Sequence, residues 1–367
     1  MELQRTPLFP MHLKYRGKMI DFGGWELPVE YEDTGILTEH RHVRRHAGLF
    51  DVSHMGEVDV RGEQAEAFVQ NLVVNSISVL AENQICYSPL CYPDGGCVDD
   101  LLIYKYARDH FFIVLNAANT DKDFTWMQQQ VWPGVSLQNL SSSYAELALQ
   151  GPEAEAVLQR LCDADLGAIR YYWFHNQVQI AGIECIVSRT GYTGEDGFEL
   201  FTGPEWACSL WEAILEAGQG RVLPIGLGAR DSLRFEAKLP LYGHEIDKEI
   251  TPLEARLDRF VKLNKPSFIG REALAGQYQT RPQRLLVEFE MVGRGIPRAH
   301  YEIQKDGQVI GWVTSGGYAP TLDKNIGLAL VKREFAASGE QFDVLIRNKP
   351  VRAQVGEGIF YKRQKNS

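Results

Sequence analysis

Apolar residues recur along the first three quarters of the chain in two spacings, one helical and one extended. A spacing of three to four residues predicts helices at residues 36–47, 63–74, 120–131 and 204–218. Residues 222–237 are expected to run from a glycine turn into another helix. Alternating or short continuous apolar runs predict strands at residues 56–60, 84–90, 96–104, 111–115, 145–150, 178–188 and 198–201. Strands and helices therefore alternate over this part of the chain.

Turn and cap residues refine three segments of this pattern. Thr120, with Asp123 three residues later, resembles a capping box at a helix start. The Gly151-Pro152 pair is expected to open a helix with proline in its first turn. Residues 21–31 combine glycines, a tryptophan and a proline, so we expect a packed loop there and not a regular element.

The last quarter of the chain has a different pattern. Short strands are predicted at regular intervals, at residues 285–289, 301–304, 309–314, 326–331, 342–346 and 351–355. The composition turns polar at residues 276–283, and no repeat or long linker interrupts the chain. We therefore expect a packed junction near Tyr278 that separates residues 1–278 from an all-β domain at residues 279–367.

Length and charge limit the functional classes. The 367 residues are enough for two or three domains. With 38 basic and 48 acidic residues the net charge is −10, which excludes nonspecific binding to nucleic acid because phosphates would be repelled. No apolar run approaches the roughly 18 residues of a membrane span, and the first residues lack a signal-peptide core. We expect a cytoplasmic protein with neither nucleic-acid nor membrane partners.

Neither the cysteines nor the closest histidine pair predicts a metal site. The six cysteines show no CxxC spacing and are expected to be reduced thiols without disulfides. His42 and His46 are one helical turn apart, as two zinc ligands would be, but Arg41, Arg44 and Arg45 surround them and no HExxH motif is present. A solvated basic helix face is the preferred interpretation.

A pair of aspartates follows the glycine turn at residues 94–96. Asp99 and Asp100 lie at the start of an apolar strand, and successive strand side chains point to opposite faces. The two carboxylates therefore cannot form a dyad that shares a proton, and at most one of them faces a site. The alternative is that both accept hydrogen bonds from turn amides.

Three further segments carry candidate chemistry. The glycine-rich residues 190–197, TGYTGEDG, lack the lysine of a nucleotide P-loop. Gly226 and Gly228 let a backbone approach a helix start, where Arg230 is suited to a bidentate contact with an anion. The alternative is that Arg230 and Arg234 form surface salt bridges with Asp231 or Glu236. Asn116, between a strand and a helix, is either a ligand contact or a turn former.

Eight ordered segments together resemble a known family over essentially the whole chain. They are DFGGWELPVEY, EHRHVRRHAGLFDVSHMGEV, YPDGGCVDDLLIY, LNAANTDKD, LALQGPEA, SRTGYTGEDGFEL, PIGLGARDSLRFEAKLPLYGHEI and TSGGYAPTLDKNIGLALV. Their content and order resemble the T-protein family of the glycine cleavage system, the tetrahydrofolate-dependent aminomethyltransferases.

The resemblance implies a fold, a reaction and partners. The implied fold is a three-lobed α+β cloverleaf, in which two intertwined lobes with mostly antiparallel sheets bind folate and a C-terminal β-barrel follows. The implied reaction takes the aminomethyl group on the lipoyl arm of the H protein, releases ammonia and passes the one-carbon unit to tetrahydrofolate as 5,10-methylenetetrahydrofolate. No metal is expected.

Carried over position by position, the resemblance also implies site residues. The catalytic aspartate of the family falls on Asp100. The folate-binding positions fall on Glu199, Arg230, Tyr87, Asn116, Tyr192 and Met55. A carboxylate at Glu199 could accept hydrogen bonds from a pterin, and a guanidinium at Arg230 could bind the acidic part of the ligand.

One departure and two alternatives accompany the resemblance. Arg256 in TPLEARLDRF stands where the family usually has a small residue, so local packing or partner approach could differ there. A folate-binding module without transferase activity is one alternative, but the KGCYxGQ segment of the RNA-modification relative is absent from the sequence. The folate domain of a flavin-dependent demethylase is the other, but no GxGxxG follows an N-terminal strand.

Overall fold

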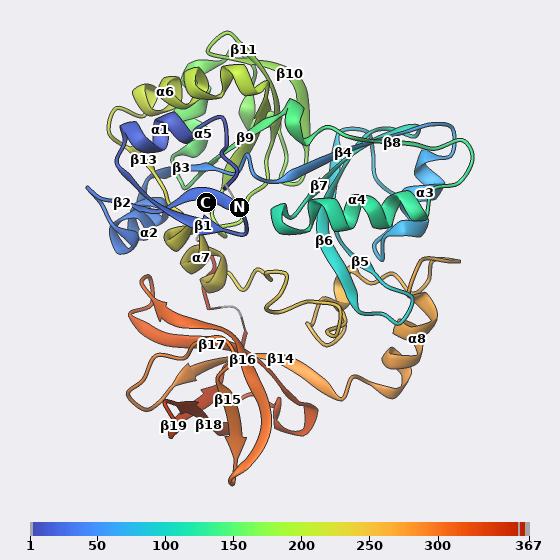
Figure 1. Ribbon diagram of the computed structural model, residues 1–367, viewed down its shortest axis with the longest axis vertical. Helices are drawn as coiled ribbons and strands as arrows, with labels where there is room; N and C mark the ends of the chain where they lie inside the picture. The colour runs from blue at the N-terminus through green and yellow to red at the C-terminus, as the bar shows by residue number, and fades with distance from the viewer. Residues whose placement is uncertain (1–2, 359, 364–367) are drawn as a thin grey trace. The chain divides into compact units, whose positions relative to one another are not determined.

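The computed structural model describes residues 3–358 and 360–363 (Figure 1). The chain divides into two compact units. Unit 1 contains Met1–Phe68, Ile77–Cys86 and Leu101–Leu233, and unit 2 contains Val69–Ser76, Tyr87–Asp100 and Arg234–Ser367. Strands β5 (Gln84–Cys91) and β6 (Cys97–Ala107) each include residues of both units.

A six-stranded sheet forms the centre of unit 1, in the order β10-β11-β12-β9-β3-β13. Its strands are β3 (Ala47–Asp51), β9 (Ala145–Gln150), β10 (Phe174–Ile180), β11 (Ile183–Ser188), β12 (Gly197–Thr202) and β13 (Val222–Pro224). Neighbouring strands are antiparallel except for β13, which runs parallel to β3.

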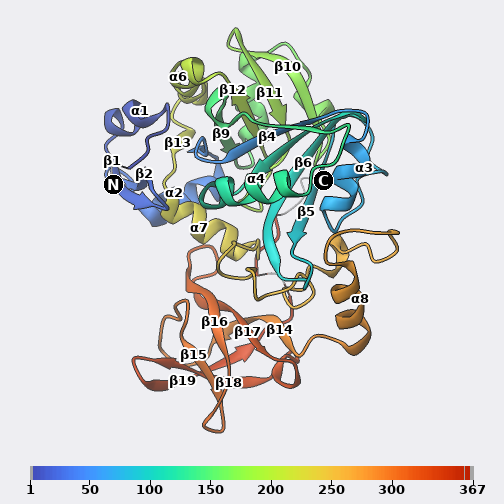
Figure 2. The same ribbon diagram turned by 45° about the vertical axis from the view of Figure 1, so that its right-hand side comes forward.

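Helices cover both faces of this sheet, in a way that follows from the alternation of its residues. Leu147 and Leu149 of β9 point into a core with α1 (Phe9–Lys14), α5 (Ala154–Leu158) and α6 (Ala207–Gly218). Ala148, between them, points to the opposite face, where α2 (Ile36–Arg45) and α7 (Leu227–Glu236) pack. Figures 1 and 2 show α1 and α6 beside this sheet.

A second sheet has the strand order β5-β6-β7-β4-β8. In addition to β5 and β6 it contains β4 (Gly56–Arg61), β7 (His110–Leu115) and β8 (Ser136–Asn139), and α3 (Ala65–Leu72) and α4 (Thr120–Gln129) follow β4 and β7 along the chain (Figure 2). Short 3-10 turns complete the chain: Ala117–Asn119, Ser141–Ser143, Gln159–Leu161, Leu166–Ala168, Pro204–Trp206, Asp258–Phe260 and Arg333–Phe335.

Unit 2 contains a closed six-stranded barrel in the order β14-β17-β16-β15-β18-β19. The strands are β14 (Arg284–Met291), β15 (Glu302–Lys305), β16 (Gln308–Ala319), β17 (Lys324–Lys332), β18 (Gln341–Ile346) and β19 (Lys349–Val355), and helix α8 (Arg271–Thr280) precedes them. All six strands predicted for the last quarter of the chain are confirmed. The α+β class with a C-terminal barrel is confirmed as well.

Residues 21–31 are not a loop, and that prediction was wrong. They belong to a hairpin of β1 (Gly17–Phe22) and β2 (Trp25–Tyr31), with Phe22 opposite Trp25. Gly23 and Gly24 both have positive φ, at 60° and 92°, and so form the two-residue turn that joins antiparallel strands with the correct twist. Asp21 accepts a hydrogen bond from the Gly24 amide at 2.9 Å.

Two helix-start predictions were also wrong. Thr120 is the first residue of α4 and not its cap, and its hydroxyl donates to the Asn116 carbonyl at 3.4 Å. The helix after Gly151-Pro152 begins only at Ala154, so the proline precedes the helix. Gly151 has φ of 137°, and a Cβ added there would lie 2.2 Å from the His46 carbonyl oxygen. Glycine is therefore needed where these two chain segments come close.

Candidate functional site

Five of the predicted site residues lie in unit 1. Met55 follows β3, Asn116 ends β7, Tyr192 lies in the glycine-rich loop, Glu199 is in β12 and Arg230 is in α7. Met55 packs against the apolar residues of both sheets of this unit. Glu199 is buried with 8% of its surface exposed, and the other four are partly buried.

Three of these side chains influence one another directly. The Arg230 guanidinium lies over the Tyr192 ring, 4.8 Å from its centroid, which is a cation–π arrangement. Burial raises the pKa of Glu199, while the Thr190 hydroxyl and the Arg230 charge act in the opposite direction. This part of unit 1 therefore presents a carboxylate, a cation and an aromatic face to a ligand.

The glycine-rich loop is held in place by a buried arginine. Arg44 of α2 donates to the Thr193 carbonyl at 2.7 Å and to the Glu195 carboxylate at 2.8 Å. It also donates to the Leu233 carbonyl at 3.2 Å, at the end of α7. The interpretation of residues 41–45 as a solvated basic face was therefore wrong at Arg44, which anchors the loop that carries Tyr192.

Three buried titratable groups near this set were missed by the sequence analysis. His54 precedes Met55, and burial together with the Arg230 charge lowers the pKa of His54 to about 4. Burial raises the pKa of Glu57 well above its ordinary range. Burial, followed by the charges of Glu199 and Glu57, does the same for the pKa of Glu146. For each of the three groups, burial favours the uncharged form.

The hydrogen bonding of the three groups agrees with these directions. One nitrogen of His54, Nδ1, and one oxygen of each glutamate, Oε2, are buried without a hydrogen-bond partner within residues 3–358 and 360–363. A buried ion without partners costs far more than a neutral group, so burial favours the protonated acid for the two glutamates and the unprotonated imidazole for His54. The available signal was the polar residue inside the apolar strand AELALQ, where Glu146 interrupts the core pattern.

Unit 2 contains the other two predicted site residues. The Tyr87 hydroxyl donates to Oδ2 of Asp100 at 2.9 Å, and the Tyr87 ring meets Phe260 edge to face, with 4.7 Å between centroids. Asp100 is 9% exposed, whereas Asp99 is fully buried. The two neighbouring carboxylates therefore have different surroundings, as the strand alternation predicts.

The glycine turn before these aspartates is confirmed, with a different role for its last glycine. Gly95 has φ of 93°, and the Gly96 amide donates to Oδ1 of Asp94 at 3.1 Å. A Cβ added at Gly96 would lie 2.0 Å from the Lys248 carbonyl oxygen. The chain itself therefore comes close to Gly96, so the requirement for glycine there arises from packing within unit 2.

Two other predictions about arginines and glycines need correction. Arg234 does not lie on the helix surface but is buried, donating to Glu245 at 2.9 Å and to the Ser315 hydroxyl at 3.0 Å. Gly226 lies against the Val29 carbonyl of β2, where a Cβ would be 2.5 Å away. The backbone that approaches the start of α7 is thus that of β2.

No group of three or more candidate metal ligands occurs within residues 3–358 and 360–363. His42 and His46 lie 4.9 Å apart between ring centroids, and they bond to the Arg221 carbonyl and to Glu153 respectively. The six cysteines are free thiols. In the same part of the chain, no helix is both long and apolar enough to cross a membrane.

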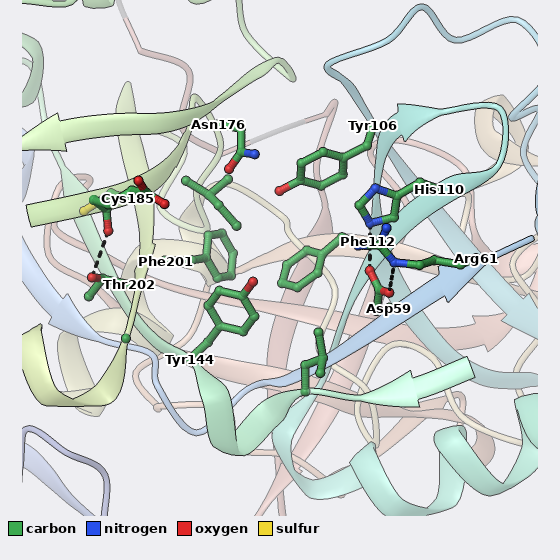
Figure 3. Close-up of a pocket in the computed structure, with 14 residues that line it drawn as sticks. Asp59, Arg61, Tyr106, His110, Phe112, Tyr144, Asn176, Cys185, Phe201 and Thr202 are labelled. Carbon is green, nitrogen blue, oxygen red and sulfur yellow. Dashed lines mark hydrogen bonds and ion pairs between the residues drawn. The ribbon is translucent and has the colours of Figure 1, made fainter. Parts of the chain in front are cut away.

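A cavity of about 260 Å³ lies elsewhere in unit 1, lined by residues from the first half of β7 and the end of β12 (Figure 3). Tyr106, Phe112, Tyr144 and Phe201 line it together with the Asp59–Arg61–His110 ion-pair cluster, which Figure 3 shows on one side. None of the predicted site residues lines this cavity.

Comparisons with known proteins place the whole chain in one family. Residues 8–265 match the GCVT N-terminal domain, and residues 284–362 match the glycine cleavage T-protein C-terminal barrel domain. An aminomethyltransferase of Desulfitobacterium hafniense strain Y51 is 56% identical over 366 residues, covering 99% of both chains. One of Caldanaerobacter subterraneus is 53% identical, covering 98% of this chain and 96% of the relative.

A solved structure agrees with these relatives. The crystal structure of the glycine cleavage system aminomethyltransferase T from Bartonella henselae matches with a TM-score of 0.91, at 33% identity and with 98% of each chain covered. Both the matched domains and the full-length relatives extend over nearly all of this sequence. The chain therefore belongs to the glycine cleavage T-protein family of aminomethyltransferases.

Proposed function

We propose that this chain accepts the aminomethyl group carried on the lipoyl arm of the H protein and transfers its one-carbon unit to tetrahydrofolate in the cytoplasm. The products are 5,10-methylenetetrahydrofolate, ammonia and the reduced lipoyl arm. Tetrahydrofolate supplies the two amines that accept the carbon. We also propose that residues 1–278 form the catalytic region and that residues 279–367 form the barrel domain.

The unit 1 residues suit a reduced folate. Glu199 can accept paired hydrogen bonds from the row of pterin N–H donors, since a carboxylate is a bidentate acceptor. Tyr192 offers an aromatic face, and Arg230, stacked on it, can bind the acidic part of the ligand. Met55 and Asn116 are proposed to form further pocket wall. This assignment rests on the buried carboxylate next to a stacked arginine.

The Tyr87–Asp100 pair supports a catalytic role for unit 2. A carboxylate at Asp100 stabilises the positive charge that develops as the carbon leaves sulfur and is attacked by an amine. The phenol of Tyr87 holds one carboxylate oxygen, at 2.9 Å, and so fixes the orientation of the other. Electrostatic stabilisation requires only an ionised carboxylate, whereas a general base would need a tuned pKa.

The single observation that carries the catalytic assignment is this hydrogen bond between Tyr87 and Asp100. The test is to mix the protein with aminomethylated H protein and tetrahydrofolate and to measure ammonia release. We expect release that depends on all three components. Folate binding without ammonia release would favour the alternative, a folate-binding module without transferase activity.

Substitution of the aspartate tests its role separately. We expect Asp100→Asn to lower turnover by about 100- to 1,000-fold while folate binding is largely kept, because the charge is lost and the shape is not. Asp94→Asn, at the exposed turn of the same hairpin, is the matched control and should retain turnover. Near-normal turnover of Asp100→Asn with folate bound would contradict the electrostatic role.

A further inference from the structure

A chain of three buried hydroxyl groups ends on Glu199. The Tyr104 hydroxyl lies 3.1 Å from the Ser188 hydroxyl, and the Ser188 hydroxyl lies 2.8 Å from that of Thr190. The Thr190 hydroxyl donates to Oε2 of Glu199. Each of the three residues is at most 2% exposed, so no bulk solvent competes for these hydrogen bonds.

Strand register places these groups side by side. Ser188 of β11 is directly opposite Glu199 of β12, so their side chains share one face of the sheet. Thr190 lies two residues beyond Ser188, outside the strand, and its hydroxyl reaches both the Ser188 hydroxyl and the Glu199 carboxylate. Tyr104, from β6, reaches this face from the second sheet of unit 1.

The position of the Tyr104 hydroxyl is fixed by aromatic packing. Its ring contacts those of Phe112, Phe174 and Phe201, with centroids 5.8, 5.2 and 5.8 Å away. Figure 3 shows Phe112 and Phe201 at the wall of the cavity in unit 1. The hydroxyl chain thus begins in a rigid aromatic cluster and ends at the proposed pterin acceptor.

The direction of every hydrogen in the chain follows from the charge at its end. An ionised carboxylate only accepts, so Thr190 must donate to Glu199. The Ser188 hydroxyl has two acceptors within reach, the Thr190 oxygen at 2.8 Å and the Glu199 backbone carbonyl at 3.3 Å. We assign its proton to the shorter contact, so that the Ser188 oxygen accepts from Tyr104. Three O–H dipoles therefore point toward the carboxylate, and hydrogen bonds aligned in this way polarise and strengthen one another.

We infer that Thr190, Ser188 and Tyr104 are positioning residues that keep Glu199 ionised and fix its Oε2, leaving its remaining lone pairs for the donors of a reduced folate. The inference rests on the proposed role of Glu199 in folate binding and adds how that carboxylate stays charged although it is buried. Burial alone would favour the protonated acid, which cannot accept a row of N–H donors.

The direct effect of each group differs with its distance from the carboxylate. Removing the Thr190 hydroxyl takes away a charge-assisted hydrogen bond, which corresponds to about tenfold to a hundredfold in affinity. Removing the Tyr104 hydroxyl only weakens the polarisation of the chain, and we expect a twofold to fivefold loss. Both changes also raise the pH below which binding is lost, because they favour protonated Glu199.

The experiment measures binding of 5-formyltetrahydrofolate, a stable reduced folate, by calorimetry from pH 5.5 to 8.5. We expect Thr190→Val to weaken binding and to move the acidic limb of the pH profile up by about one unit. Thr190→Ser restores the hydroxyl and should return both affinity and profile toward wild type. Tyr104→Phe should move the profile in the same direction by less.

Thr202→Val is the matched control. Thr202 is a buried threonine on the same strand as Glu199, and its hydroxyl donates to the Glu184 carbonyl at 3.0 Å, outside the chain of hydroxyls. Thr202→Val should bind the folate as wild type does, with no shift in the acidic limb of its pH profile. A purely structural role of Thr190 would weaken binding equally at every pH.

The outcomes distinguish failure of the proposed function from failure of the positioning role of the hydroxyl chain. Wild-type protein that fails to bind the reduced folate at any pH would overturn the proposed function. Wild-type protein that binds, together with Thr190→Val and Tyr104→Phe profiles that coincide with it, would overturn the positioning chain and leave the proposed function in place. If Thr190→Val does not fold, the Tyr104→Phe profile decides the question.

Discussion

Replacement of His54 by glutamine should change how the stability of unit 1 depends on pH. His54 is 3% exposed, and its pKa is lowered to about 4 from 6.5. Between these values the unfolded chain binds a proton that the folded chain does not, so stability is complete above pH 6.5 and is lost as the pH falls toward 4. The linkage relation gives a loss of about 2 kcal/mol between pH 7.5 and pH 5.

Urea unfolding followed by tryptophan fluorescence measures this loss, because six of the seven tryptophans lie in unit 1. The difference in unfolding free energy between wild type and His54→Gln should fall by about 2 kcal/mol from pH 7.5 to pH 5. His175→Gln, on the exposed side of β10, is the control and should remain parallel to wild type. Parallel curves for His54→Gln and wild type would refute the reasoning.

Three further substitutions test other contacts, each by urea unfolding. Arg44→Ala removes the anchor of the glycine-rich loop and should cost about 3–5 kcal/mol, because it breaks a buried ion pair from one side. Gly96→Ala forces a Cβ against the Lys248 carbonyl and should cost about 2–4 kcal/mol, whereas Gly276→Ala in α8, with open space around it, should be neutral or stabilising. The raised pKa of Glu57 makes its contribution to stability complete below pH 4.5 and lost as the pH rises through the folded pKa. Glu57→Gln should therefore flatten this decline, so that its stability relative to wild type is higher at pH 7.5 than at pH 4.5; equal slopes would contradict it.

Most strands were predictable because their signal is local. Alternating apolar residues and turn residues alone predict the six barrel strands and the hairpin of β5 and β6. The predicted bounds of each strand agree with the observed bounds to within a few residues. The β1–β2 hairpin was missed although Gly23-Gly24 is a recognised two-residue turn. Pro28, together with the glycines, is typical of a loop. It is tolerated in β2 because the strand pair has a register shift nearby.

Side-chain partners were much less predictable, since they depend on residues distant in the sequence. Arg44 pairs with Glu195, 151 positions away, and no local pattern marks that contact. Strand alternation did predict that Asp99 and Asp100 would differ in their surroundings, and they do. Which of them serves catalysis came from the resemblance and stays a prediction, as do the roles of Glu199, Arg230, Tyr87, Tyr192, Asn116 and Met55.

The closure of the barrel has a consequence for synthesis of the protein. The last strand, β19, pairs with both β18 and β14, so the ring is complete only when this strand has left the ribosome. Until then β14 and β18 each expose unpaired backbone N–H and C=O groups, which recruit other strands. A chain that stops before Lys349 would therefore expose two unpaired strand edges. We expect such a chain to aggregate, and not only to lose some stability.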